Sequence, residues 1–86
     1  MHFMNTFAFT INDNDQHELS EFIPVKLTNL ISIYSDSEFY IYGNNENAAG
    51  IKIDTKQFTS SYLPEAIDVS KWKIKGQGNY TIEMYV

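Results

Sequence analysis

Large apolar residues alternate with polar or small residues at both ends of the chain, and this pattern constrains the fold more than any other feature. Near the N-terminus every second position of the segment 3–11 is apolar except Asn5. Near the C-terminus, Trp72 and Ile74 alternate with lysines, and the segment 80–86 alternates in the same way. A period of two residues indicates strands with one buried face. The sequence therefore predicts strands over 3–11, 72–75 and 80–86.

Two turns are predicted to join neighbouring strands as β-hairpins. The segment 25–34 is rich in β-branched residues, which favour a strand. A three-residue loop at 35–37 would place Ile33 opposite Phe39 and Ile31 opposite Ile41. A second hairpin would turn at 76–79, with an inner face of Trp72, Ile74 and apolar residues of the last strand. That last strand is expected at a sheet edge because the chain ends there.

Helical spacing occurs in one short stretch before Pro24. Leu19, Phe22 and Ile23 are spaced i, i+3, i+4, and Asp15 with Glu18 resembles a capping box. We expect a short helix over 15–22, ending at or before the proline.

A single helical turn is expected to begin at Pro64, and a short strand is expected over 51–53. Together these elements predict an α+β fold, in which one or two short helices cover an antiparallel sheet of about five strands. The alternative is a small all-β barrel. The 86 residues are expected to form one domain, 1–86, with a thin core.

Composition and motifs argue against catalytic and metal-binding sites. The chain has no cysteine and two histidines, which removes thiol nucleophiles and zinc–thiolate sites. Asp13, Asp15 and His17 suggest a metal loop, but Glu18 and Pro24 occupy the positions where a calcium loop needs Gly and Glu. We expect no metal, no cofactor and no enzymatic activity. With no apolar run near the roughly 18 residues of a membrane span and no basic leader, a cytoplasmic protein is expected.

Charge is distributed unevenly along the chain. Seven of the eleven carboxylates lie in residues 1–50 against one cation, Lys26, so this half sums to −6, whereas the rest sums to +1. Arginine is absent. An acidic surface repels nucleic acid and anionic membranes and attracts basic proteins. Lys71, Lys73 and Lys75 beside Trp72 are interpreted as the charged outside of a strand, so no direct nucleic-acid binding is expected.

These observations predict a small acidic protein-binding module that is a monomer or a small homo-oligomer. It would be an inhibitor of the phage or mobile-element type, which occludes the basic nucleic-acid-binding groove of a host nuclease or defence enzyme by mimicking DNA. Anti-CRISPR, anti-restriction and immunity proteins have this character. The residues predicted to bind the partner are acidic side chains and three tyrosines: Asp13, Asp15, Glu18, Asp36, Glu38, Glu46, Tyr34, Tyr40 and Tyr42.

The sequence is also compatible with two alternative roles for these residues. The carboxylates would equally suit solvated faces that keep a small protein soluble. The alternative function is a structural or assembly subunit that self-associates through the predicted C-terminal edge strand.

Overall fold

The computed structural model describes residues 4–24, 26–43, 49–61 and 65–85, and in these ranges the chain is built almost entirely of strands. Sheet A contains β1 (Met4–Ile11), β10 (Gly78–Tyr85), β4 (Leu30–Ser35) and β7 (Gln57–Ser61), in that spatial order. Sheet B contains β2 (His17–Glu18), β9 (Lys73–Lys75), β5 (Phe39–Tyr42) and β6 (Ile51–Ile53). All strand pairs are antiparallel. A third, two-stranded sheet pairs β3 (Leu27–Thr28) with β8 (Ile67–Asp68).

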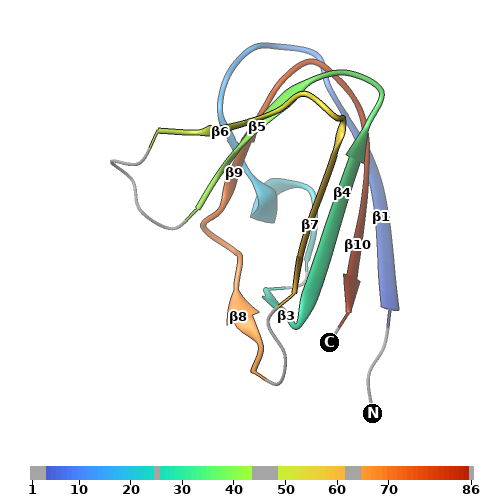
Figure 1. Cartoon of the computed structure of the whole chain (residues 1–86), viewed down its shortest axis with the longest axis vertical. Coiled ribbons are helices and arrows are strands. Elements are labelled where there is room, and N and C mark those ends of the chain that lie inside the picture. The colour runs from blue at the N-terminus through green and yellow to red at the C-terminus, as the bar shows by residue number, and fades with distance from the viewer. Residues whose placement is uncertain (1–3, 25, 44–48, 62–64, 86) are drawn as a thin grey trace.

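The two larger sheets are one four-stranded sheet folded over on itself. Each strand of sheet A is joined to the strand at the same position in sheet B, so that β1 continues into β2 and β4 into β5, while β6 continues into β7 and β9 into β10. The registers put all four connections at the same end of the strands, which is the top of Figure 1. We call this region the corner end, and it consists of residues 12–16, 36–38, 54–56 and 76–77.

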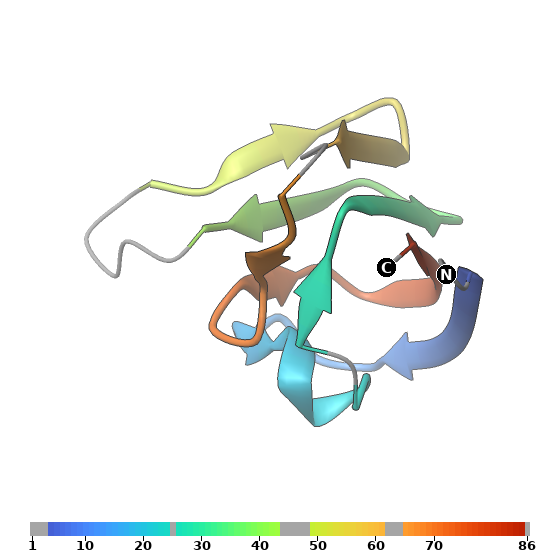
Figure 2. The same cartoon turned by 90° about the horizontal axis from the view of Figure 1, so that it is seen from below.

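The core lies between the two facing layers (Figure 2). Sheet A contributes Ile31, Ile33, Tyr80, Ile82 and Met84, all at most 2% exposed. Ile11 lies at the end of β1 in sheet A, sheet B contributes Phe39, Ile41, Ile53 and Ile74, and the segments between the strands add Leu19, Ile23, Val69 and Trp72. Burying such side chains is worth about 1.5–3 kcal/mol each before the entropy of folding is counted. The radius of gyration, 12.1 Å, matches the roughly 12 Å of a compact chain of this length.

The α+β expectation is wrong, because the described residues contain no α-helix. In the segment predicted as a helix, residues 17 and 18 form β2, and only one 3-10 turn follows, η1 (Leu19–Glu21). The backbone N–H groups of Phe22 and Ile23 both donate to the Leu19 carbonyl at 3.0 Å. Leu19 and Ile23 are both buried at this turn, so the apolar residues at helical spacing are explained by a single turn and need no longer helix. The capping box is absent, since Glu18 is extended and makes no side-chain cap.

The all-β alternative has the right class, but the strands form the folded sheet rather than a closed barrel, since no pairing joins β1 to β7 or β2 to β6. Of the second predicted helical turn, Pro64 lies outside the described residues, and Ile67 is in a strand.

Both predicted hairpins are wrong, although the predicted inner faces are confirmed. Residues 36–38 and 76–77 carry the chain from one sheet to the other, so β4 does not pair with β5, nor β9 with β10. The inward positions Ile31, Ile33, Ile74, Ile82 and Met84 are nevertheless fully buried.

The predicted C-terminal edge strand is also wrong. β10 lies between β1 and β4 and pairs with both along most of its length. β10 is therefore not the open edge through which self-association was suggested, because its backbone groups already pair with two neighbouring strands. Sequence reasoning missed β7 altogether, since Phe58 is its only large apolar residue.

Candidate functional site

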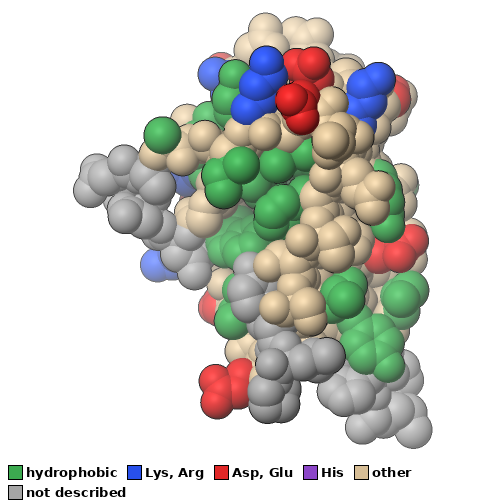
Figure 3. Space-filling view, viewed as in Figure 1, with side chains coloured by type: hydrophobic (Ala, Val, Ile, Leu, Met, Phe, Trp, Pro, Cys, Tyr) green, Lys and Arg blue, Asp and Glu red, His purple; other side chains and the backbone are tan. Residues whose placement is uncertain are grey.

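The corner end gathers acidic residues from three of its four connections. Asp13 and Asp15 lie in residues 12–16, Asp36 and Glu38 in 36–38, and Asp54 in 54–56. Lys56 is the one lysine within these connections. Acidic and lysine side chains are both visible there, above a hydrophobic area on the same face (Figure 3). The convergence follows from the topology, because every strand crosses between the sheets at this end.

A polar hollow of about 550 Å³ opens at the corner end. It is lined by Thr10, Ile11, Asn12, Asp36, Ser37, Gln77, Gly78 and Asn79. Segments that are far apart in the sequence thus meet at one surface, with a carboxylate among amides and hydroxyls. Such groups hydrogen-bond well to a basic or polar side chain from a partner.

Asp36 is part of the framework of this site. Its Oδ1 accepts the Asn79 backbone N–H at 3.0 Å, and its Oδ2 accepts the Asn79 side-chain amide at 2.9 Å. The Asp36 N–H donates in turn to the Asn79 carbonyl at 3.2 Å, and the Thr10 hydroxyl donates to Asn79 Oδ1 at 2.7 Å. The backbone hydrogen bond from Asn79, followed by the side-chain one, lowers the pKa of Asp36. We call the Asp36–Asn79 interaction the corner staple, since it fixes residues 36–38 to β10.

Asp13 belongs to a second framework cluster. Its Oδ1 accepts the Asp15 backbone N–H at 3.0 Å and lies 2.7 Å from Nε2 of His17. Nδ1 of the same ring lies 3.0 Å from Oε2 of Glu21. Hydrogen bonds to Asp13 and then to Glu21 raise the pKa of His17, and the bond to His17 is the main cause that lowers the pKa of Asp13. Only a protonated imidazole can donate to both carboxylates, so this clamp favours the charged ring.

The remaining acidic candidates differ in their freedom to bind. Asp15 is exposed, and no partner of its carboxylate is seen among the described residues. Glu38 lies 3.4 Å from the Lys52 ammonium, with both side chains more than half exposed, a geometry worth little energy. Glu18 lies in β2, where it is the register partner of Lys73 and accepts the Ser20 hydroxyl at 3.3 Å. Glu46 lies outside the described residues.

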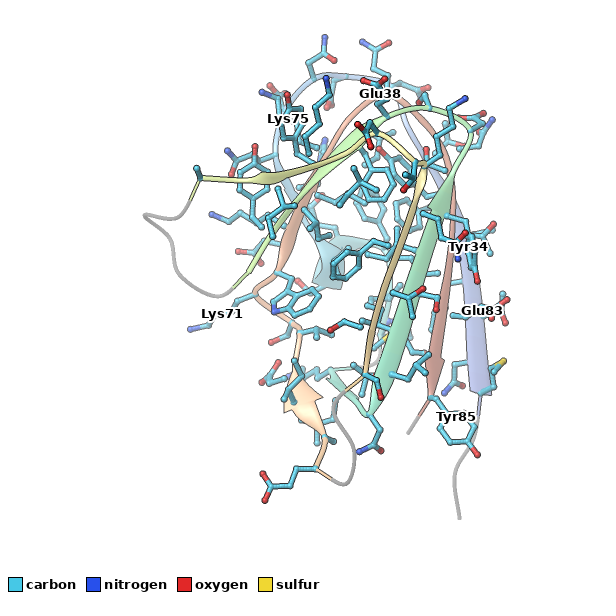
Figure 4. The ribbon with its side chains drawn as sticks, in the orientation of Figure 1. Tyr34, Glu38, Lys71, Lys75, Glu83 and Tyr85 are labelled. Atoms are coloured by element: carbon cyan, nitrogen blue, oxygen red, sulfur yellow. The ribbon has the colours of Figure 1, made fainter. Side chains whose placement is uncertain are left out.

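The three predicted tyrosines do not share a face. Tyr34 points away from sheet B on the outer side of sheet A, as do Glu83 and Tyr85 (Figure 4). Tyr40 lies on the outer side of sheet B, where its register partners are Lys52 and Lys75. The exposures of Tyr34 and Tyr40 are 36% and 38%, and both residues adjoin the corner end, from opposite sides.

Tyr42 lies two residues further along β5 from the corner end, with Lys73 as its register partner. It is only partly exposed, and its ring packs on the backbone of Gly50. The structure therefore places the tyrosines of β5 among lysines, whereas Tyr34 lies in β4, two residues before Asp36.

Sequence reasoning missed Asp54 because it weighed only the acidic first half of the chain. The usable signal was its position directly after a strand, where a connection must follow. It also missed Asn79 as the partner of Asp36, which nothing in the local sequence indicates, since the two residues are 43 positions apart.

The described residues contain no group of three or more His, Asp or Glu side chains arranged to hold a metal ion. Among the same residues, no helix is long and apolar enough to cross a bilayer. Comparison of the chain with protein-family models, with curated proteins and with solved structures gives no match.

Proposed function

We propose that this protein is a non-enzymatic, cytoplasmic binding module whose corner end docks on a basic surface of another protein. The observation that supports the proposal is the gathering of Asp13, Asp15, Asp36, Glu38 and Asp54 at one end, with Lys56 as the one lysine in the same connections. A surface with an excess of one charge sign raises the association rate with a partner of the opposite sign and selects against wrong partners.

The fitting partner class is a nucleic-acid-binding enzyme. Its binding groove is lined by cations that ordinarily meet phosphates, and rigidly held carboxylates can occupy the same positions. The corner staple and the His17 clamp fix the backbone of the connections that carry the exposed carboxylates, which lowers the entropy lost on binding. The module would thus be an inhibitor of the phage or mobile-element kind that occludes the groove of a nuclease or defence enzyme.

The residues divide into two roles under this proposal. Asp13 and Asp36 are bonded within the protein and shape the surface, whereas Asp15, Glu38 and Asp54 are exposed and available to a partner. Tyr34, beside Asp36, supplies the aromatic anchor that interfaces favour. Tyr40, Tyr42 and Glu18 lie with the lysines of sheet B and fall outside the proposed contact.

The test compares two neutralised variants with the same change in net charge. The corner variant carries Asp15→Asn and Glu38→Gln, and the control carries Glu65→Gln and Glu83→Gln, which lie outside the corner end. Each is assayed for inhibition of a panel of purified nucleases and for the salt dependence of its association rate. The corner variant should associate at least severalfold more slowly and lose much of its salt dependence, whereas the control should behave as wild type.

Two results would contradict the proposal. One is equal loss of binding in both variants, which would make net charge rather than the corner end responsible. The other is an inhibited nuclease whose affinity for the corner variant is unchanged at physiological salt.

A further inference from the structure

β1 is an open sheet edge without the usual protection. It pairs with β10 from Met4↔Tyr85 to Ile11↔Gly78 without interruption and has no second neighbour among the described strands. Figure 1 and Figure 2 both show it on the outside of the molecule. Its eight residues, MNTFAFTI, include no charge, proline or glycine. Natural proteins commonly block such an edge with charges, prolines, bulges or a very short strand.

The other edges of the two large sheets are shorter, and two of them carry a charge. β2 has two residues and includes Glu18, and β6 has three residues and includes Lys52. β7 has five residues and, like β1, contains no charge, proline or glycine, although Lys56 directly precedes it. β1, with eight residues, is therefore the longest charge-free edge in the described part of the chain.

We propose that two copies of this chain associate through β1, antiparallel about a twofold axis perpendicular to sheet A, to form a continuous eight-stranded sheet. When Phe7 pairs with Phe7 of the second copy, each odd-numbered residue of β1 lies opposite another odd-numbered residue. The inner faces of the two copies then lie on the same side of the joined sheet. On the inner face Phe9 lies opposite Asn5 of the second copy. On the outer face Thr6 lies opposite Ala8 of the second copy. Both outer positions are exposed in the single chain.

The distribution of charge favours antiparallel over parallel pairing of two copies, and β1 itself brings no charged side chain to the contact. The chain carries a net charge of −5, and many of its carboxylates lie at the corner end. Parallel pairing would bring two acidic corner ends side by side, whereas antiparallel pairing sends them to opposite ends of the dimer. Glu83 is the one charged side chain in the described strands of sheet A. The two Glu83 residues would lie about 16 Å apart, across three strand spacings and an offset of two residues along the strands, beyond the screening length of about 8 Å at physiological salt.

Lysines at the proposed axis provide the test. In the Thr6→Lys, Ala8→Lys variant, each new lysine faces a new lysine of the second copy. The control, Gln57→Lys with Thr59→Lys, makes the same change in the same two cross-strand rows at the opposite edge of sheet A. Both variants gain two positive charges, which reduces general repulsion between copies. Sedimentation equilibrium from micromolar to millimolar protein should show a wild-type dimer that the β1 variant weakens at least about tenfold and the control preserves.

Cross-linking gives a second readout, because the natural chain has no cysteine. A mixture of Thr6→Cys and Ala8→Cys chains should form the mixed disulfide dimer, whereas Thr59→Cys chains should not cross-link. A wild-type chain that stays monomeric at millimolar concentration would overturn the proposal. So would a dimer that the control dissociates as readily as the β1 variant.

Discussion

Gly78 at the start of β10 provides a sharp test of how the corner end is built. Its φ of +151° is one that residues with a side chain rarely adopt. A Cβ at this position would lie 2.5 Å from Oγ of Ser37 and 2.6 Å from Oδ1 of Asp36. Because Asp36 Oδ1 accepts the backbone N–H of Asn79, Gly78→Ala must either distort β10 or open the corner staple.

The magnitude follows from the backbone conformation, since an unfavourable one costs about 1–3 kcal/mol. Opening the exposed corner staple adds to this loss. The free energy of unfolding should therefore fall by at least about 1–3 kcal/mol. In a domain of this size, each kcal/mol shifts the midpoint of thermal unfolding by about 4–8 °C, so a decrease on the order of 5–25 °C is expected.

Urea and thermal unfolding of Gly78→Ala measure this effect, and Gly43→Ala is the matched control. A Cβ at Gly43 would meet no atom within 4 Å, and its backbone has no positive φ, so the same methyl should leave stability nearly unchanged. In an Asp36→Ala background, the carboxylate that a Cβ at position 78 would meet is absent. Gly78→Ala should therefore lower the free energy of unfolding by less in that background than in wild type. If Gly78→Ala were no more destabilising than Gly43→Ala, the close packing inferred for the corner end would be refuted.

Two further predictions concern other polar clusters. Because the pKa of His17 is raised in the folded state, its clamp with Asp13 and Glu21 stabilises the fold fully below pH 6.5 and loses this effect as pH rises through the raised value. Urea unfolding at a series of pH values should show this decline in wild type, and a His17→Asn variant that declined equally would disprove it. The buried Thr28 hydroxyl bonds the Leu30 and Tyr85 carbonyls and the Leu30 N–H, so Thr28→Val should lower the free energy of unfolding by about 1–3 kcal/mol. Thr6→Val, at an exposed position whose hydroxyl makes no hydrogen bond within the described residues, should change it by less than about 0.5 kcal/mol in the same urea assay.

The acidic candidates illustrate how much of the site was predictable. A run such as Asn12–Asp15 indicates a turn through its own side chains, so the placement of Asp13, Asp15, Asp36 and Glu38 in connections could be predicted. Their convergence could not, because it depends on all four connections lying at one end. The tyrosines could not be placed from the sequence. Alternation put Tyr34, Tyr40 and Tyr42 on the same side of a hairpin, but it could not show that Tyr34 lies in sheet A and the other two in sheet B.

The sequence by itself determined which side of each long strand is buried. Alternation is a local property, because successive side chains of a strand point to opposite faces whatever the strand pairs with. This is why the inward positions of β1, β9 and β10 were predicted correctly although their pairings were not. The absence of charge from β1 is likewise visible in the sequence.

Only the tertiary structure decided where the strands pair and therefore what the surface displays. The turn residues at 36–38 and 76–77 suit a hairpin as well as a crossing between sheets, since both need the same local bend. The choice was made by non-local contacts: Asp36 with Asn79, Phe9 stacked on Phe22 at 4.2 Å, and β10 between β1 and β4. Inserting β10 there leaves β1 as the open edge and brings the carboxylates to one end. The strands that produce this arrangement extend from Met4 to Tyr85, so no short segment contains all of the partners.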